Sequence, residues 1–336
     1  MYLYDDYVDL HLRTVERGAA LPRMGGALSP DIVPWGVVSD TDAAPVAAPL
    51  PPQWDRDPGQ ALVPGVPNSI YLRCRNGGGN ELPGHLYLAA GPACMPCWPD
   101  QLTPVPTPAG RDYASIKVPG GKSGVTSTPF LHVPESATDT LAAWIVTSKH
   151  PLAPPEATRS VHRLRTFFET TAGYVQRSVG FGIEGEYCHA ARYEQRDAAA
   201  MMQLELRFHD CPRRWTLSVL PDDPMGPLQI EPFDVSAPAM SVVVRAMVPA
   251  GYIDTLTLRI DSRGIPAPST ARVDMVLSLV VADALDDATV MEGGGLMLGI
   301  RRPPAAFRLG SHSWRARSPE SRKDKAGGAL RLPATS

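Results

Sequence analysis

The chain has 336 residues, 43% of them apolar, and its 32 basic and 35 acidic side chains give a formal net charge of −3. This balance excludes a global positive field that would hold a polyanion, and no window approaches the roughly 18 uninterrupted apolar residues of a helical membrane span. The 36 prolines exceed the average share of about 5% roughly twofold and argue against a mainly helical protein, because proline interrupts helices.

The N-terminal arm, residues 1–27, contains one expected strand. Val8, Leu10 and Leu12 alternate with polar residues, which is the period of a strand with one apolar face. A strand at the edge of a fold needs a partner, so we expect these three residues to contact another subunit. The arm lacks the basic segment and long apolar run of a secretory signal. We therefore expect synthesis in the cytoplasm without a classical signal, and a final place in the cytoplasm or in an extracellular or virion particle.

Residues 28–152 have the pattern of a first β-sandwich. A proline-rich stretch is followed by short apolar alternations bounded by Pro, Gly or Asp, which is typical of sandwiches with frequent turns. The expected strands are 70–75, 85–90, 113–118, 125–133 and 141–147.

Within this region, the phrase Ile70 to Gly77 reads apolar-x-apolar-x-Cys-Arg-Asn-Gly, a strand running into a glycine turn. Together with the SPDI segment at Ser29 and the late strand TDTLAAWIVT, it resembles the immunoglobulin-like CARDB-type modules of bacterial adhesion and surface proteins. The resemblance covers residues 29–147. It implies a sandwich fold and an adhesive role, and it carries no catalytic residues.

A helical linker is predicted at 153–175, because Val161, Leu164 and Phe168 follow helical spacing without an internal Pro or Gly. Residues 176–309 then predict a second sandwich. Its alternating strands are expected at 202–208, 215–219, 242–248, 256–260 and 273–281. Their polar outer faces favour antiparallel sheets over a parallel α/β sheet. The predicted fold class is all-β, with two immunoglobulin-like antiparallel β-sandwiches joined by a short helix.

Residues 310–336 form the predicted basic tail, with six Lys or Arg against two acidic residues. Such a segment is expected to be disordered alone. Its basic residues suit phosphate or an acidic neighbour, and a solvated tail is the favoured interpretation. Two tryptophans outside the expected core strands, Trp54 and Trp314, are candidate partner anchors with Arg315 and Arg317, because large exposed rings need a cover.

Four cysteines are weak candidates for zinc ligands. Cys94 and Cys97 form a C-x-x-C pair, and Cys188 and Cys211 lie beside His189 and His209, but no second compact knuckle completes a zinc site. The prolines around the pair do not suit a redox dithiol at a helix start. The favoured interpretation is two loop thiols or a local disulfide, with no bound metal.

No cofactor-binding or catalytic motif occurs with the residue spacing that it requires. Gly121-Lys122-Ser123 resembles the end of a phosphate loop, but Ile116 stands where the first glycine is required. Neighbouring acids such as Asp222 and Asp223 are typical of solvated loops, although they leave open a calcium clip or an acid–base pair. We predict no cofactor and no catalysis.

The sequence therefore predicts a non-catalytic structural or adhesive component of a larger assembly, such as a surface array or a phage-like particle. Its partners are expected to be other protein subunits, a second copy of the chain included, with no specific nucleic acid. Two alternatives stay open. An exposed aromatic row would favour a carbohydrate-binding accessory module, and a deep pocket with converging acids or histidines would favour an enzyme.

Overall fold

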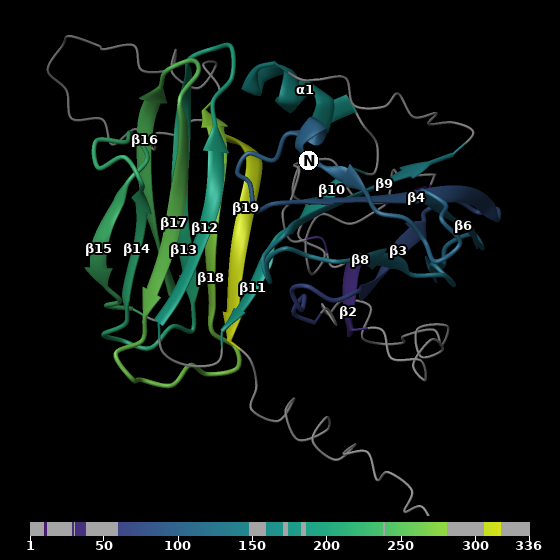
Figure 1. The fold of residues 1–336 in the computed structure, drawn as a ribbon, viewed down its shortest axis with the longest axis horizontal. Helices are drawn as coiled ribbons and strands as arrows, with labels where there is room; N and C mark the ends of the chain where they lie inside the picture. The colour runs from purple at the N-terminus through teal and green to yellow at the C-terminus, as the bar shows by residue number, and fades with distance from the viewer. Residues whose placement is uncertain are drawn as a thin grey trace, which may run out of the picture.

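The computed structural model describes residues 10–11, 29, 31–37, 60–147, 159–170, 174–182, 186–237, 239–280 and 306–316. Within them the chain is predominantly β, with two pairs of sheets and the helix α1 (Val161–Thr170) between them (Figure 1). The prediction of an all-β protein built from antiparallel sandwiches is confirmed. No helix in this part of the chain is long and apolar enough to cross a membrane.

We call the first pair of sheets the first sandwich. One sheet has the order β1-β3-β2, with β7 and β8 also paired to β3, and comprises β1 (Leu10–His11), β3 (Asn68–Asn76), β2 (Ile32–Val37), β7 (Ser123–Val125) and β8 (Phe130–His132). The other has the order β10-β9-β4-β5, with β6 paired to β4, and comprises β10 (Val175–Arg177), β9 (Thr140–Val146), β4 (Leu82–Gly91), β5 (Thr103–Pro104) and β6 (Tyr113–Val118). The core between the sheets includes Ile70, Leu72, Leu86 and Leu88.

The second pair of sheets is the second sandwich. One sheet has the order β11-β19-β18-β13-β16 and comprises β11 (Val179–Gly182), β19 (Ala306–Ala316), β18 (Arg272–Val280), β13 (Ala200–His209) and β16 (Ala239–Val248). The facing sheet has the order β12-β17-β14-β15 and comprises β12 (Glu186–Glu194), β17 (Ile253–Asp261), β14 (Thr216–Pro221) and β15 (Ile230–Asp234). All pairs are antiparallel except β11 with β19.

The alternation read from the sequence sets which side of each strand is buried. Leu204, Leu206 and Phe208 of β13 lie in the core, while Gln203, Glu205 and Arg207 lie on the opposite face of the sheet. A strand's side chains alternate between its two faces, so a period of two fixes this orientation. At about 25 cal/mol per Å² of apolar surface buried, such faces supply the main favourable free energy of the fold.

Two elements differ from the expected layout. After α1 the chain returns to the first sandwich as β10, which pairs with β9 through Val175 to Arg177, and only then enters the second sandwich as β11. Residues 310–316 belong to β19 and not to a tail, because β19 pairs with β18 along its length. The prediction of a tail beginning at 310 is therefore wrong for these residues.

Candidate functional site: the two edges and the outer face of the second sandwich

One edge of the second sandwich is closed by a loop of the first. The loop between β4 and β5 runs beside β12 as an added strand: the Arg192 N–H donates to the Ala93 carbonyl at 2.9 Å, and the Met95 N–H donates to the Arg192 carbonyl at 2.8 Å. This is the loop that carries the C-x-x-C motif. It covers the backbone groups that an edge strand would otherwise expose.

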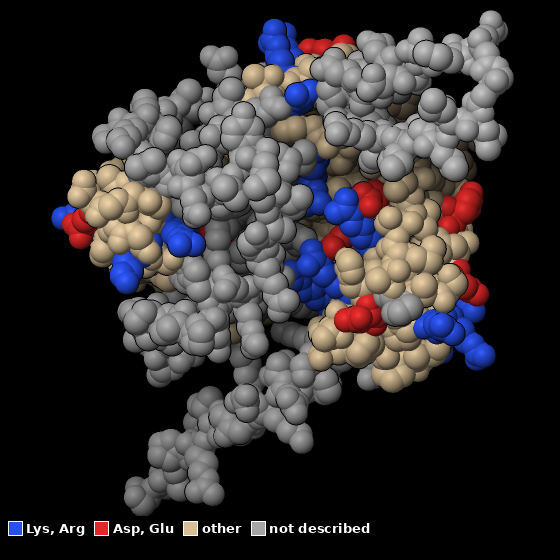
Figure 2. All heavy atoms as spheres, turned by 180° about the vertical axis from the view of Figure 1, so that it is seen from behind, with Lys and Arg blue, Asp and Glu red and all other residues tan. Residues whose placement is uncertain are grey.

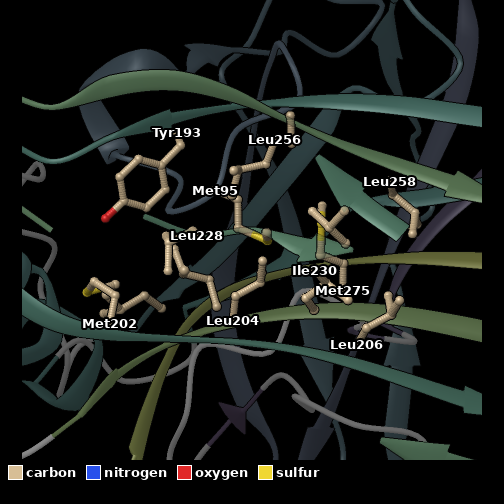
Figure 3. Packing of buried hydrophobic residues seen from close by; sticks show 14 of the residues in the cluster. Met95, Tyr193, Met202, Leu204, Leu206, Leu228, Ile230, Leu256, Leu258 and Met275 are labelled. Atoms are coloured by element: carbon tan, nitrogen blue, oxygen red, sulfur yellow. The ribbon is translucent and has the colours of Figure 1, made fainter. Parts of the chain in front are cut away.

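Two side chains anchor this closing loop. Met95, only 1% exposed, points among core residues of the second sandwich such as Leu204 and Leu256 (Figure 3). Trp98 is fully buried, and its indole N–H donates to the Glu194 carbonyl at 3.1 Å. The Arg196 guanidinium lies over the Trp98 ring, 4.4 Å from its centre. The loop therefore joins the two sandwiches through a shared core.

The thiols of this loop are placed for packing. Cys97 is buried, and burial together with the neighbouring Cys94 raises its pKa well above the ordinary value, which leaves it protonated and a poor nucleophile. Cys188 is exposed on β12, and Cys211 lies near the carbonyls of His209 and Arg272. Within the described residues, no group of three or more His, Cys, Asp or Glu side chains could hold a metal ion.

A buried histidine pair lies inside the same edge. The rings of His189 on β12 and His312 on β19 stack with 3.4 Å between their centres. The two ring nitrogens of His312 face hydroxyl groups, Ser178 at 2.9 Å and Tyr187 at 3.1 Å. Gly180 is required here, because a Cβ at this position would lie 1.8 Å from the Tyr187 hydroxyl. Burial lowers the pKa of His189 to about 4 and the pKa of His312 well below its ordinary value, so both rings are neutral at pH 7.

At the far end of the facing sheet, the β16 edge is unpaired within the described residues. β16 pairs with β13 on one side, and no other strand in the described part of the chain pairs with it. Its sequence, AMSVVVRAMV, is rich in β-branched residues and has a single charge. Val243 and Met247 are 43% and 57% exposed. A long, apolar and unprotected edge is the form of strand that pairs with another chain.

The outer face of the β16-β13-β18-β19 sheet is rich in arginine, and we call it the arginine face. Its guanidinium groups belong to Arg207, Arg245, Arg272, Arg308 and Arg315. Arg207 binds Glu205 through two bonds of 2.7 Å, and Arg272 binds Asp274 at 2.8 Å. Figure 2, which looks at the molecule from behind, shows basic and acidic side chains gathered on this side of the second sandwich.

A row of aromatic rings crosses the first sandwich. Tyr113, Tyr87 and Trp144 are direct cross-strand neighbours on β6, β4 and β9, and Tyr174 continues the row. The Tyr87 and Trp144 rings are parallel, 5.6 Å apart at an interplanar angle of 3°. Rings stacked in this way cover each other's faces. Tyr87 and Trp144 therefore cover one ring face of each other.

The residues predicted to bind a partner lie in different environments. Trp314 is 3% exposed and packs edge-on against Trp215 in the core, so the prediction of an exposed anchor is wrong. Its neighbours on β18 and β11 bury it as part of a sheet. Arg315 is half-buried on the arginine face, and the backbone of Leu10 pairs with Asn76 in the first sandwich. Val8, Leu12, Trp54 and Arg317 lie outside the described residues.

No family model and no curated protein matches the chain. Among solved structures, it is similar to red sea bream transglutaminase at a TM-score of 0.23 and 11% identity, over 77% of this chain but only 30% of that one. It is also similar to the enterotoxigenic E. coli adhesin CfaE (TM-score 0.18, 12% identity, covering 78% of this chain and 81% of that one). A third is the CupB6 tip adhesin of Pseudomonas aeruginosa (TM-score 0.16, 9% identity, 92% and 96%). These low similarities assign neither a family nor a function.

Proposed function

We propose that the protein is a non-catalytic structural or adhesive component that joins a neighbouring subunit through the open edge of β16. The single observation that carries the proposal is this edge: ten residues, one charge, no proline, and apolar side chains facing solvent. Backbone groups along an edge supply affinity, and alternate side chains supply specificity, when a strand from another chain is added.

The simplest neighbour is a second copy of this chain. Two β16 edges related by a two-fold axis would pair antiparallel and extend the sheet across the interface, which is the self-complementary arrangement that two-fold dimers use. The resemblance of residues 29–147 to CARDB-type adhesion modules accords with an adhesive role in a surface or virion particle.

The test compares the size of the full chain with that of an edge variant by light scattering over a range of concentrations. Replacing Val243 and Met247 with lysine places two charges on the face of the edge strand, and charged edges resist pairing. The matched control replaces two other exposed apolar residues, Met225 and Ile253, which are 88% and 58% exposed and lie away from β16.

We expect the native chain and the control to form dimers or larger assemblies, and the edge variant to remain monomeric. Thermal stability should stay the same in all three, because exposed substitutions usually change the free energy of unfolding by about 0.5 kcal/mol or less. A native chain that remains monomeric at every concentration, or an edge variant that assembles like the control, contradicts the proposal.

A further inference from the structure

The two cysteines of the closing loop face each other across a bend. The chain bends at Met95 and Pro96, the two residues between Cys94 and Cys97, and the two thiol side chains are close enough to share a hydrogen bond. Both thiols are free. A disulfide requires two cysteines whose backbones are close and whose side chains point toward each other. The loop meets this requirement before any bond is formed.

The backbone on either side of the bend is held in place. The Cys94 N–H donates to the Thr140 hydroxyl of β9 at 3.4 Å, and the Gln176 side-chain amide of β10 donates to the Cys97 carbonyl at 3.4 Å. Both partners belong to the first sandwich, while Met95 between the cysteines packs into the second. The approach of the two thiols is therefore fixed by contacts on both sides of the loop.

The two thiols differ in their access to solvent. Cys94 is partly exposed, whereas Cys97 is buried. A reagent in solution therefore meets Cys94 first. Cys97 needs no access of its own, because its reaction partner is the neighbouring sulfur inside the loop. One exposed thiol with a second thiol poised behind it is the arrangement in which an intramolecular disulfide forms through a mixed disulfide.

We propose that Cys94 and Cys97 form an intramolecular disulfide that locks the closing loop, with a small disulfide such as oxidised glutathione as the oxidant. The Cys94 thiol loses its proton and attacks one sulfur of the small disulfide, which breaks that S–S bond and releases one small thiol. The Cys97 thiol then loses its proton, attacks the Cys94 sulfur and releases the second small thiol. In sum, two electrons and two protons pass from the cysteines to the small disulfide.

The bond would act on the joint between the two sandwiches. A disulfide restricts the unfolded chain, so the oxidised protein should resist unfolding more than the reduced one. Burial raises the pKa of Cys97, so the second step is slow. Disulfides persist in oxidising surroundings, which accords with the surface or extracellular component proposed above. The formation of the bond does not depend on the β16 edge.

The test follows the thiols of the full, reduced chain in mixtures of reduced and oxidised glutathione. Samples are quenched with acid, alkylated in denaturant, digested with trypsin and weighed by mass spectrometry. Arg75 and Arg111 bound a tryptic peptide, 76–111, that contains Cys94 and Cys97 and no other cysteine. Cys188, an exposed thiol on β12, is the internal control. The variants Cys94→Ser and Cys97→Ser each leave one thiol of the pair.

We expect peptide 76–111 to lose two hydrogens and both alkylation sites. This should require about tenfold less oxidised glutathione than the attachment of glutathione to Cys188, because the second thiol of the pair is intramolecular. In Cys97→Ser, Cys94 should keep one glutathione. In Cys94→Ser, Cys97 should stay reduced because it is buried. The oxidised native chain should melt about 2 °C above the reduced chain, a shift that Cys97→Ser should not show.

Two results would overturn the inference. One is a peptide 76–111 that keeps two free thiols, or retains glutathione on Cys94, when Cys188 is already modified. The other is closure of the bond only in denaturant, which would mean that the folded loop holds the thiols apart. Light scattering on the same samples separates the two proposals. If the bond forms in a chain that never assembles, only the proposed function of the β16 edge fails.

Discussion

Both edges of the second sandwich end in a strand whose backbone groups can pair with another chain. The two edges differ in how these groups are covered. At the β12 edge, the chain supplies its own cover, because the loop carrying Met95 and Trp98 pairs with Arg192 and fills the gap between the sheets. At the β16 edge, nothing in the described part of the chain pairs with the strand. Edge strands usually carry protection against pairing. The contrast shows that the fold can protect an edge, and that no described residue protects β16 in this way.

The neighbouring edge strand sharpens this contrast. β15, at the end of the facing sheet, has Glu231, Pro232 and Asp234 among its five residues. Charge and proline are common devices against unwanted pairing. Two adjacent edges of one sandwich therefore differ in chemistry, and the apolar one is the candidate interface.

The largest loss of stability is expected when the closed β12 edge is disrupted. Trp98→Ala removes a fully buried ring, its hydrogen bond to the Glu194 carbonyl and its contact with Arg196. Such truncations cost about 3–5 kcal/mol, which we expect as a loss of unfolding free energy in urea titrations. The matched control is Trp35→Ala, a half-buried ring beside Val33 and Tyr71, which should cost less. Equal losses for the two variants would show that Trp98 has no special role in joining the sandwiches.

The next effect is a loss of stability in acid at the same edge. His189 has a folded pKa of about 4 against an ordinary value of 6.5, so the unfolded state binds a proton more readily. The free energy of unfolding should therefore fall as pH drops from about 6.5 to 4, by up to about 3 kcal/mol from this group, with no contribution above about pH 7.5. His312 acts in the same direction.

The measurement is a set of urea titrations between pH 4 and 7.5. His189→Phe keeps an aromatic ring on His312 but does not titrate, and should reduce the acid loss. His162→Gln alters an exposed histidine of α1 and should leave the pH dependence unchanged. Identical pH profiles for the native chain and His189→Phe would refute the assignment.

A smaller difference in stability is expected between substitutions of the two cysteines in the closing loop. Cys97 is buried and Cys94 is partly exposed. We expect Cys97→Ala to lower the unfolding free energy by about 1–2 kcal/mol and Cys94→Ala by less, since the loss follows the buried volume removed. Elemental analysis should find no stoichiometric zinc in the native protein. One equivalent of zinc, lost in both variants, would instead establish a metal site at this pair.

Strands with an uninterrupted period of two could be predicted from the sequence, and β13, β16, β17 and β18 lie where alternation placed them. β19 was missed for a physical reason. Its bulge between Arg308 and Gly310 shifts the alternation by one residue, so Phe307 and Leu309 on one side of the bulge and His312 and Trp314 on the other do not form a single pattern. The basic residues beside them then indicated a solvated tail.

The candidate sites needed the structure. A C-x-x-C motif suggests thiol chemistry, yet Met95 between the cysteines makes the important contact, and no local pattern reveals that a loop packs into a core about a hundred residues away in sequence. The arginine face depends on registers between four strands that are far apart in the chain. Alternation shows that Arg207 faces outward, but only the pairing shows that Arg308 shares its face.

The smallest expected effect is a change in amide exchange at the β16 edge, which can be measured without any substitution. Successive residues of a paired strand direct their backbone groups to alternate sides, so every second N–H of β16 bonds to β13 and the others point to the open edge. The outward N–H groups should exchange with deuterium quickly in dilute solution and become protected at high concentration, where a second copy covers them. Amide exchange followed by NMR at two concentrations measures this directly. β17, which is paired on both sides, serves as the control, and its exchange should not depend on concentration. If the β15 edge gains the same protection as β16, association is non-specific, and the chemical difference between the two edges does not select the interface.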